Sequence, residues 1–167
     1  MLALQADVTK EADLQRAVDA TLKSFGRIDI LVNNVGGSIP GDAESISPQA
    51  WREQFEFNLH YVHASTRIVA PLIVKQGGGA IINISSIAGL RHLGNELAAY
   101  AASKAGLQHF SRVCAVRYAP HGVRVNTVIP GLMNTPLVAE RLAKSQAGGD
   151  AAALIAKRNA RTPTGKM

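Results

Sequence analysis

Residues 80–104 read AIINISSIAGLRHLGNELAAYAASK, and this stretch contains the elements that indicate the fold. An apolar run rich in β-branched residues ends in Ser85 and Ser86, a loop with glycines follows, and a helix-favouring segment carries Tyr100 and Lys104. Residues four apart lie on the same face of a helix, so the phenol and the ammonium can point into the same space. A strand, a loop and a helix in this order are typical of a parallel sheet with crossover helices.

The two side chains suit proton transfer. A free tyrosine titrates near ~10, and a fixed positive charge beside it favours the phenolate and lowers its pKa. The hydroxyl of Ser86, at the end of the neighbouring strand, could hold a substrate oxygen at the same point, so the group suits chemistry at a carbonyl or alcohol oxygen. Tyr-x-x-x-Lys also occurs by chance on amphipathic helices, and a serine at a strand end is commonly part of a turn. The interpretation therefore depends on the rest of the chain.

The composition is that of a globular protein. The 167 residues are 47% hydrophobic and 18% charged, which fits a single domain of ~100–200 residues and argues against a disordered chain. No apolar run approaches the ~18 residues of a membrane span, and the first residues lack a signal-peptide pattern. We expect one domain over residues 1–167, no membrane partner and a cytoplasmic location. Cys114, in an apolar helical stretch, is expected to be a buried small hydrophobe.

The net charge of +6 is unevenly spread. Residues 140–167 hold six basic and two acidic residues. A basic tail could contact nucleic acid, but no aromatic residues interleave with these charges and no DNA-binding motif occurs. A solvated face, or a segment near a phosphate-bearing cofactor, is the simpler interpretation, so we expect no nucleic-acid partner. The five histidines show no metal-site pattern, and no metal is expected.

Helices and strands alternate along the chain, as in a parallel sheet with crossover helices. Ser47 and Pro48 are a typical N-cap and first helical residue, Gly26 is a typical helix end, and Pro71 is expected to disturb the helix that contains it. The expected strands are residues 2–5, 28–33, 80–85 and 123–128. The expected helices are residues 10–25, residues 47 to the mid-seventies, the segment that carries Tyr100 as far as about residue 118, and residues 137–160.

Polar or glycine residues follow each expected strand. They are Asp7, the Asn33–Gly36 segment, the Ser85–Ser86 pair and the Pro130–Gly131 pair. In sheets of this kind, ligands bind outside the carboxyl ends of the strands. Signals at four equivalent places are difficult to explain as turns alone, so the sequence predicts a ligand site at this edge, together with Tyr100 and Lys104.

With these motifs the chain resembles the short-chain dehydrogenase/reductase family. Residues 33–36 (NNVG) are similar to its Asn-Asn-Ala-Gly motif, residues 100–104 (YAASK) to its active-site motif, and residues 126–131 (NTVIPG) to the motif next to the nicotinamide. The resemblance covers nearly the whole chain. It implies an α/β fold, a Rossmann-like doubly wound parallel sheet with helices on both faces, forming a partial dinucleotide-binding and catalytic domain.

The resemblance also implies catalytic roles. Tyr100 would be the general acid/base, Lys104 would lower its pKa and hydrogen-bond the nicotinamide ribose, and Ser86 would orient the substrate carbonyl. Asn58 would hold a water in a proton relay behind the lysine. Because asparagine is a weak helix former, its place within an expected helix fits a functional kink, and a tolerated surface residue is the alternative.

On the cofactor side, the resemblance implies contacts from four parts of the chain. Asp7 and the Val8 backbone would meet the adenine, and Asn34 and Gly36 would line the adenosine side. The Met133 backbone and Thr135 would contact the nicotinamide carboxamide. The cofactor would be NAD or NADP, and the choice is unreadable because the residue that separates them follows a strand this sequence lacks.

Segments of the family pattern are absent from the sequence. A first strand, a glycine-rich turn and a second strand would precede Met1, and a final helix and strand would follow Met167. We therefore expect an incomplete sheet, without its first two strands and its last strand. Loss of the first strand, between residues 2–5 and 28–33, would expose a long apolar edge.

Our leading hypothesis is an NAD(P)-dependent oxidoreductase that interconverts a secondary alcohol and a ketone. The complete protein is expected to be a dimer or tetramer of identical chains. One alternative is a catalytically inactive truncated fragment that at most associates with a partner chain, and another is a basic nucleic-acid binder. A largely apolar substrate would lie against Leu90, His92, Leu93, Leu97, Met133, Leu137 and Val138.

Overall fold

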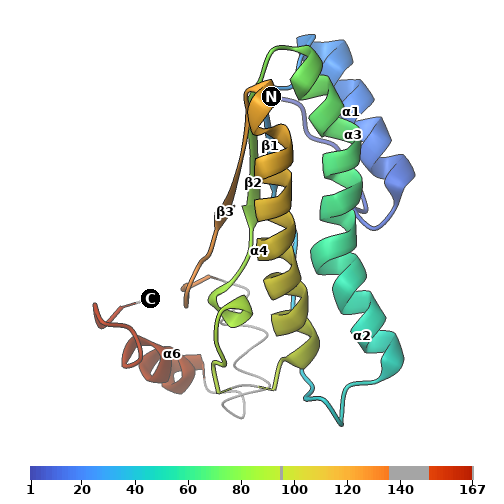
Figure 1. Cartoon of the computed structure of the whole chain (residues 1–167). Coiled ribbons are helices and arrows are strands. Elements are labelled where there is room, and N and C mark those ends of the chain that lie inside the picture. The colour runs from blue at the N-terminus through green and yellow to red at the C-terminus, as the bar shows by residue number, and fades with distance from the viewer. Residues whose placement is uncertain (95, 136–150, 167) are drawn as a thin grey trace. The chain divides into compact units, whose positions relative to one another are not determined.

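The computed structural model describes residues 1–94, 96–135 and 151–166. The chain divides into two compact units, Met1–Ile129 and Pro130–Met167. The first unit contains the sheet and the helices discussed below (Figure 1). The second contains α6 (Ala151–Asn159), which falls within the helix expected over residues 137–160. Residues 137–150 of that expected helix, with Leu137 and Val138 among them, lie outside the described residues.

The first unit is built on a parallel sheet of three strands, β1 (Ile30–Asn33), β2 (Gly79–Ile84) and β3 (Val123–Val128), in that order. Ile30 pairs with Ala80 and Asn33 with Asn83, so β1 ends one residue before the end of β2. The predicted α/β class with a parallel sheet is confirmed. Because the strands are parallel and in register, their carboxyl ends meet along one edge.

The helices α1 (Glu11–Phe25), α3 (Tyr61–Lys75) and α4 (Ala98–Tyr118) pack on one face of this sheet (Figure 1). Successive strands are added in one direction, and right-handed crossovers then place the connecting helices α3 and α4 on the same side. Ile30, Val32 and Val128 are 59%, 54% and 48% exposed. Among the described elements of this unit, the opposite face of the sheet is therefore open. The core on the covered face consists of Val18, Val69, Ala70, Ile73, Ile81, Cys114, Val123 and Val125.

Local signals set the ends of the helices. Gly26 adopts a left-handed conformation with φ of 77° and caps α1, its N–H donating to the Leu22 carbonyl over 2.8 Å. At the start of α2 (Pro48–Phe55), the Ser47 hydroxyl accepts from the Ala50 N–H over 3.1 Å. The helix continues through a π-helical segment, Glu56–His60, into α3. It also runs through Pro71 to Lys75, so the proline does not end it.

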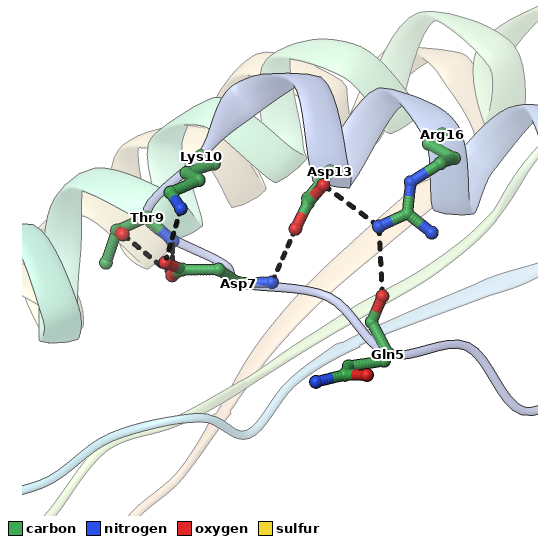
Figure 2. A network of polar contacts seen from close by, with 6 residues as sticks. All are labelled: Gln5, Asp7, Thr9, Lys10, Asp13 and Arg16. Carbon is green, nitrogen blue, oxygen red and sulfur yellow. Dashed lines mark hydrogen bonds and ion pairs between the residues drawn. The ribbon is translucent and has the colours of Figure 1, made fainter.

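Residues 2–5 do not form the expected strand. A strand needs ladder hydrogen bonds to a neighbour, and the described sheet places no strand beside this segment. Instead, the Arg16 guanidinium donates to the Gln5 carbonyl and to the Asp13 carboxylate, each over 2.9 Å (Figure 2). The Asp13 carboxylate in turn accepts from the Asp7 N–H over 2.8 Å. The segment is therefore attached to α1 rather than to the sheet.

Candidate active site

Lys104 is buried at the carboxyl end of the sheet. Its side chain comes from α4, is 3% exposed, and donates from Nζ to the carbonyl of Ile84, the last residue of β2, over 2.9 Å. Nζ lies 5.9 Å from the centre of the Tyr100 ring, one helical turn earlier. Burial lowers the pKa of Lys104 to about 8, because a charged ammonium loses hydration there. The structure thus brings the predicted Tyr100 and Lys104 together.

Gly36 brings Lys104 and Asn58 into one cluster. A Cβ atom added to Gly36 would lie 2.9 Å from Nζ of Lys104 and 2.9 Å from Oδ1 of Asn58. Gly36 follows β1, whereas Asn58 and Lys104 come from two different helices. Only a residue without a side chain leaves room for both polar groups, and the exposed backbone of Gly36 borders them.

Asn58 lies in the π-helical segment and is fully buried. The Tyr61 N–H bonds to the Glu56 carbonyl five residues earlier, which widens the helix at this point. The side chain of Asn58 accepts from the Gly37 N–H over 3.1 Å and donates to the Gly37 carbonyl over 2.9 Å, so it pairs with the backbone in both directions. It also donates to the Gln54 carbonyl over 2.9 Å. A helix irregularity is confirmed here, and the alternative of a surface residue is wrong.

Ser85 and Ser86 point to different partners. The buried Ser85 hydroxyl donates to the Lys104 carbonyl over 3.0 Å, so it serves to join β2 to α4. The half-buried Ser86 accepts at Oγ from the Ala88 N–H over 3.2 Å. Because that bond uses only a lone pair, the hydroxyl hydrogen of Ser86 can still be donated. The predicted preference for Ser86 over Ser85 is consistent with these bonds.

Two contacts connect the Asn34–Gly37 loop and the Asp7–Val8 pair to the same helices. The Tyr61 hydroxyl donates to the Val35 carbonyl over 2.8 Å, and burial raises the pKa of Tyr61. Val8 packs against a buried cluster that includes Tyr61 and Leu107. The exposed side of the loop carries Asn34. Both predicted adenosine-side segments therefore lie against α3, and Val8 also against α4.

The carboxylate of Asp7 is engaged in its own turn. It accepts from the Thr9 N–H over 3.0 Å and from the Thr9 hydroxyl over 2.7 Å (Figure 2). These hydrogen bonds lower the pKa of Asp7, with a smaller contribution from the Lys10 ammonium. Asp7 is thus an ionised acceptor at neutral pH, held in one orientation before α1.

Met133 and Thr135 belong to the second unit. Their contacts with the cofactor stay predictions.

A cavity of about 250 Å³ lies next to the start of α4. The Gly41 N–H donates to the Glu96 carbonyl over 2.8 Å and the Ala98 N–H to the Gly41 carbonyl over 2.9 Å, which joins the two loops beside it. Of the predicted substrate-side residues in the first unit, His92, Leu93 and Leu97 line the cavity, whereas Leu90 does not. Its other lining residues include Asp42, Ala43, Ala88, Arg91, Ala98 and Ala101.

Sequence reasoning missed two buried glutamines. Gln54 accepts from the Ile39 N–H over 3.1 Å and lies one turn before Asn58. Gln108 lies one turn after Lys104 and donates to both Ser85 and Ser86. Spacing by four residues along a helix is a signal that could have found them.

The described residues show neither a metal site nor a membrane-spanning helix. Nδ1 of His60 lies 2.8 Å from the Glu56 carboxylate, one helical turn earlier. Within the described ranges no three His, Cys, Asp or Glu side chains are grouped as a metal site would need. Every helix in those ranges is also too short or too polar to cross a bilayer.

Known proteins resemble this chain over most of its length. The family model for short chain dehydrogenases matches residues 1–146. The chain is 39% identical over 150 residues to an uncharacterised oxidoreductase of Schizosaccharomyces pombe, covering 89% of this chain and 57% of that protein. It is 36% identical over 140 residues to a cyclohexanol dehydrogenase of an Acinetobacter species, covering 83% of this chain and 55% of that protein.

A solved structure extends the match to the fold. The crystal structure of a candidate short-chain dehydrogenase/reductase from Burkholderia xenovorans has a TM-score of 0.90 and 44% identity, covering 96% of this chain and 60% of that one. The chain spans somewhat more than half the length of the curated relatives it matches. The matched part is 57% of the Schizosaccharomyces pombe protein and 55% of the cyclohexanol dehydrogenase. These likenesses in sequence and fold establish that the chain belongs to the short-chain dehydrogenase/reductase family.

Proposed function

We propose that the protein is an NAD(P)-dependent oxidoreductase that interconverts a secondary alcohol and a ketone. One observation carries the proposal: the buried Lys104 ammonium lies beside the Tyr100 ring, at the edge where Gly36 leaves space around it. Family membership and a relative named for cyclohexanol, a secondary alcohol, support the reaction class. Leu93, Leu97 and four alanines line the cavity beside the start of α4, together with polar side chains, and they support a substrate with a largely apolar body.

The residues around Gly36 fit a nicotinamide nucleotide. Lys104 has one N–H bonded to the Ile84 carbonyl, so an ammonium with three donors retains capacity for ribose hydroxyls. Asn34 and the Gly36 backbone would border the adenosine side, and Asp7 and Val8 the adenine. Met133 and Thr135 are proposed to contact the carboxamide. When bound, the nucleotide supplies the hydride donor or acceptor, whereas the protein supplies orientation and proton transfer.

The chain's own residues would handle the proton. In alcohol oxidation, Oη of Tyr100 as phenolate would take the proton from the substrate hydroxyl, and in ketone reduction the phenol would return it. Lys104, with a pKa of about 8, is mainly charged at neutral pH and would hold its positive charge beside the Tyr100 ring. The Ser86 hydroxyl would donate its hydrogen to the substrate oxygen, and Oδ1 of Asn58 would accept from a water behind Lys104.

The test compares two tyrosines on the same helix. Tyr100→Phe should lower turnover of a panel of secondary alcohols by about 100- to 10,000-fold, the usual contribution of a general acid/base. Tyr118→Phe removes a hydroxyl at the other end of α4 and should keep turnover within about twofold, because Tyr118 packs against the core at the last residue of that helix, away from Lys104. Unchanged turnover in Tyr100→Phe would contradict the proposal.

A nucleotide titration distinguishes NAD from NADP as the cofactor, and it also tests the alternative of a catalytically inactive fragment. Binding is followed by the fluorescence of NADH and, separately, of NADPH. Saturable binding of either supports the proposal and identifies the cofactor. A folded wild-type protein that binds neither nucleotide and turns over no alcohol would favour the inactive fragment instead.

A further inference from the structure

Gln108 is a buried amide that joins α4 to the end of β2. Its side chain is 5% exposed. Nε2 donates to the Ser85 hydroxyl over 3.0 Å and to the Ser86 carbonyl over 3.1 Å, so both hydrogens of the amide have an acceptor. The Ser85 hydroxyl in turn donates a hydrogen bond to the Lys104 carbonyl. Three bonds thus connect the two serines to one turn of α4.

The turn after Ser86 is pressed against the same part of α4. A Cβ atom added to Gly89 would lie 2.7 Å from Nε2 of Gln108 and 2.7 Å from the Ala105 backbone nitrogen. Such distances are not found for real side chains, so glycine is needed for this close approach. The Gly89 N–H also donates to the Ser86 carbonyl over 3.0 Å. The Ser86 carbonyl therefore receives two donors, one from its own turn and one from Gln108.

These bonds leave Ser86 little freedom. Its carbonyl is held by Gln108, and its Oγ is held by the Ala88 N–H. The remaining hydroxyl hydrogen consequently has a restricted direction. Tyr100 and Gln108 lie on the same rigid helix, eight residues or about 12 Å apart along its axis. Fixing Ser86 to Gln108 therefore also fixes it relative to Tyr100.

We propose that Gln108 is a positioning residue, which holds the Ser86 hydroxyl at the point where Tyr100 exchanges a proton with the substrate. This inference rests on the proposed function. Gln108 acts through Ser86 and contacts neither substrate nor cofactor. A purely structural glutamine would stabilise the protein without any specific connection to Ser86.

A double-mutant cycle distinguishes these roles. Gln108→Met keeps the length and removes both donors, and it should lower kcat about tenfold while the affinity for the nucleotide stays within about twofold. Ser86→Ala should lower kcat by more, about 100-fold. The double variant should equal Ser86→Ala within about twofold, because no hydroxyl remains to be positioned. The asparagine of Gln108→Asn is too short to reach both serines, so this variant should behave like Gln108→Met. It replaces Gln108→Met in the cycle if Gln108→Met does not fold.

The matched control is Ser111→Ala, on the same helix one turn later. Ser111 is also buried, accepts from Asn83 over 2.9 Å and donates to the Leu107 carbonyl over 2.7 Å. Its loss should lower Tm but keep kcat within about twofold. Multiplicative effects of Gln108→Met and Ser86→Ala, or a wild-type kcat in both Gln108 variants, would overturn the inference.

Amide hydrogen exchange tests the same bonds without turnover. In Gln108→Met, the amides of Ala88 and Gly89 should exchange at least about tenfold faster, whereas that of Cys114 should not change. Unchanged exchange at Ala88 and Gly89 would overturn the positioning role. An inactive wild-type protein would instead count against the proposed function, and the exchange result would still decide whether Gln108 holds this turn.

Discussion

Gly36→Ala is the substitution for which the structure makes the sharpest prediction. The new methyl group would lie 2.9 Å from both Nζ of Lys104 and Oδ1 of Asn58, and 3.6 Å from Cε of Lys104. Gly36 is not among the glycines with positive φ, so the backbone itself accepts alanine. The cost is therefore steric, and one or both of the polar groups have to move.

Both groups are held where they are. Nζ is bonded to the Ile84 carbonyl and Oδ1 to the Gly37 N–H. Overpacking of a tight site costs about 1–3 kcal/mol, and disturbing one of these buried bonds costs about 1 kcal/mol more. We expect a loss of about 3 kcal/mol in the free energy of unfolding. At about 3 °C for each kcal/mol, Tm falls by about 9 °C.

The effect on activity should be larger than the loss of stability explains. If Nζ moves away from Tyr100, part of the stabilisation of the phenolate is lost. About 2.7 kcal/mol of lost transition-state stabilisation corresponds to a hundredfold lower kcat. Thermal unfolding followed by circular dichroism and steady-state kinetics at a temperature where both proteins are folded measure the two effects separately.

Gly106→Ala is the matched control. It lies on α4, and its added Cβ would meet only Cδ2 of Leu59, at 3.2 Å. That atom ends a flexible side chain, and alanine is favoured over glycine within a helix by about 1 kcal/mol. Gly106→Ala should therefore keep Tm and kcat. A Gly36→Ala protein that also keeps both would refute the steric argument.

Two further predictions concern the polar groups themselves. The pKa of Lys104 is lowered from 10.5 to about 8, so the unfolded chain binds more protons than the folded one between these values. The free energy of unfolding of the wild type should rise by about 3 kcal/mol from pH 8 to pH 10.5 relative to that of Lys104→Met, which lacks the titrating group; urea unfolding of both proteins at the two pH values measures this, and a difference that does not change with pH would contradict it. Asn58→Asp keeps the acceptor for the Gly37 N–H but cannot donate to the carbonyls of Gly37 and Gln54. It should lose about 2 kcal/mol or more in urea unfolding at neutral pH, with partial recovery when the carboxyl is protonated; an unchanged midpoint would show that these bonds contribute little.

Elements set by local chemistry were predictable from the sequence. Gly26 and the Ser47–Pro48 pair mark helix limits because a cap depends on a few neighbouring residues. The strand over residues 123–128 was also predicted with its observed bounds. The strand over residues 2–5 was wrong because a strand requires a partner elsewhere in the chain.

The candidate site shows the same division. The placement of Tyr100, Lys104 and Gly36 followed from motifs on a helix and after a strand, and the structure brings all three together. Gln108 was missed because its two acceptors are 22 and 23 residues away in sequence. Asn58 was expected to mark a kink, but helix propensity alone does not indicate a π-helix, which also depends on the bonds to Gly37.

The π-helical segment at Glu56–His60 behaves as one residue inserted into an otherwise regular helix. Each residue of an α-helix turns it by about 100°. Deleting one residue here would make the helix regular, but would rotate Asn58 away from Gly37 or turn Val62, Val69 and Ile73 out of the core. The π-helical segment thus lets the residues before it face the loop while those after it face the core. A change of length in this segment is therefore not equivalent to a change of length in a surface loop.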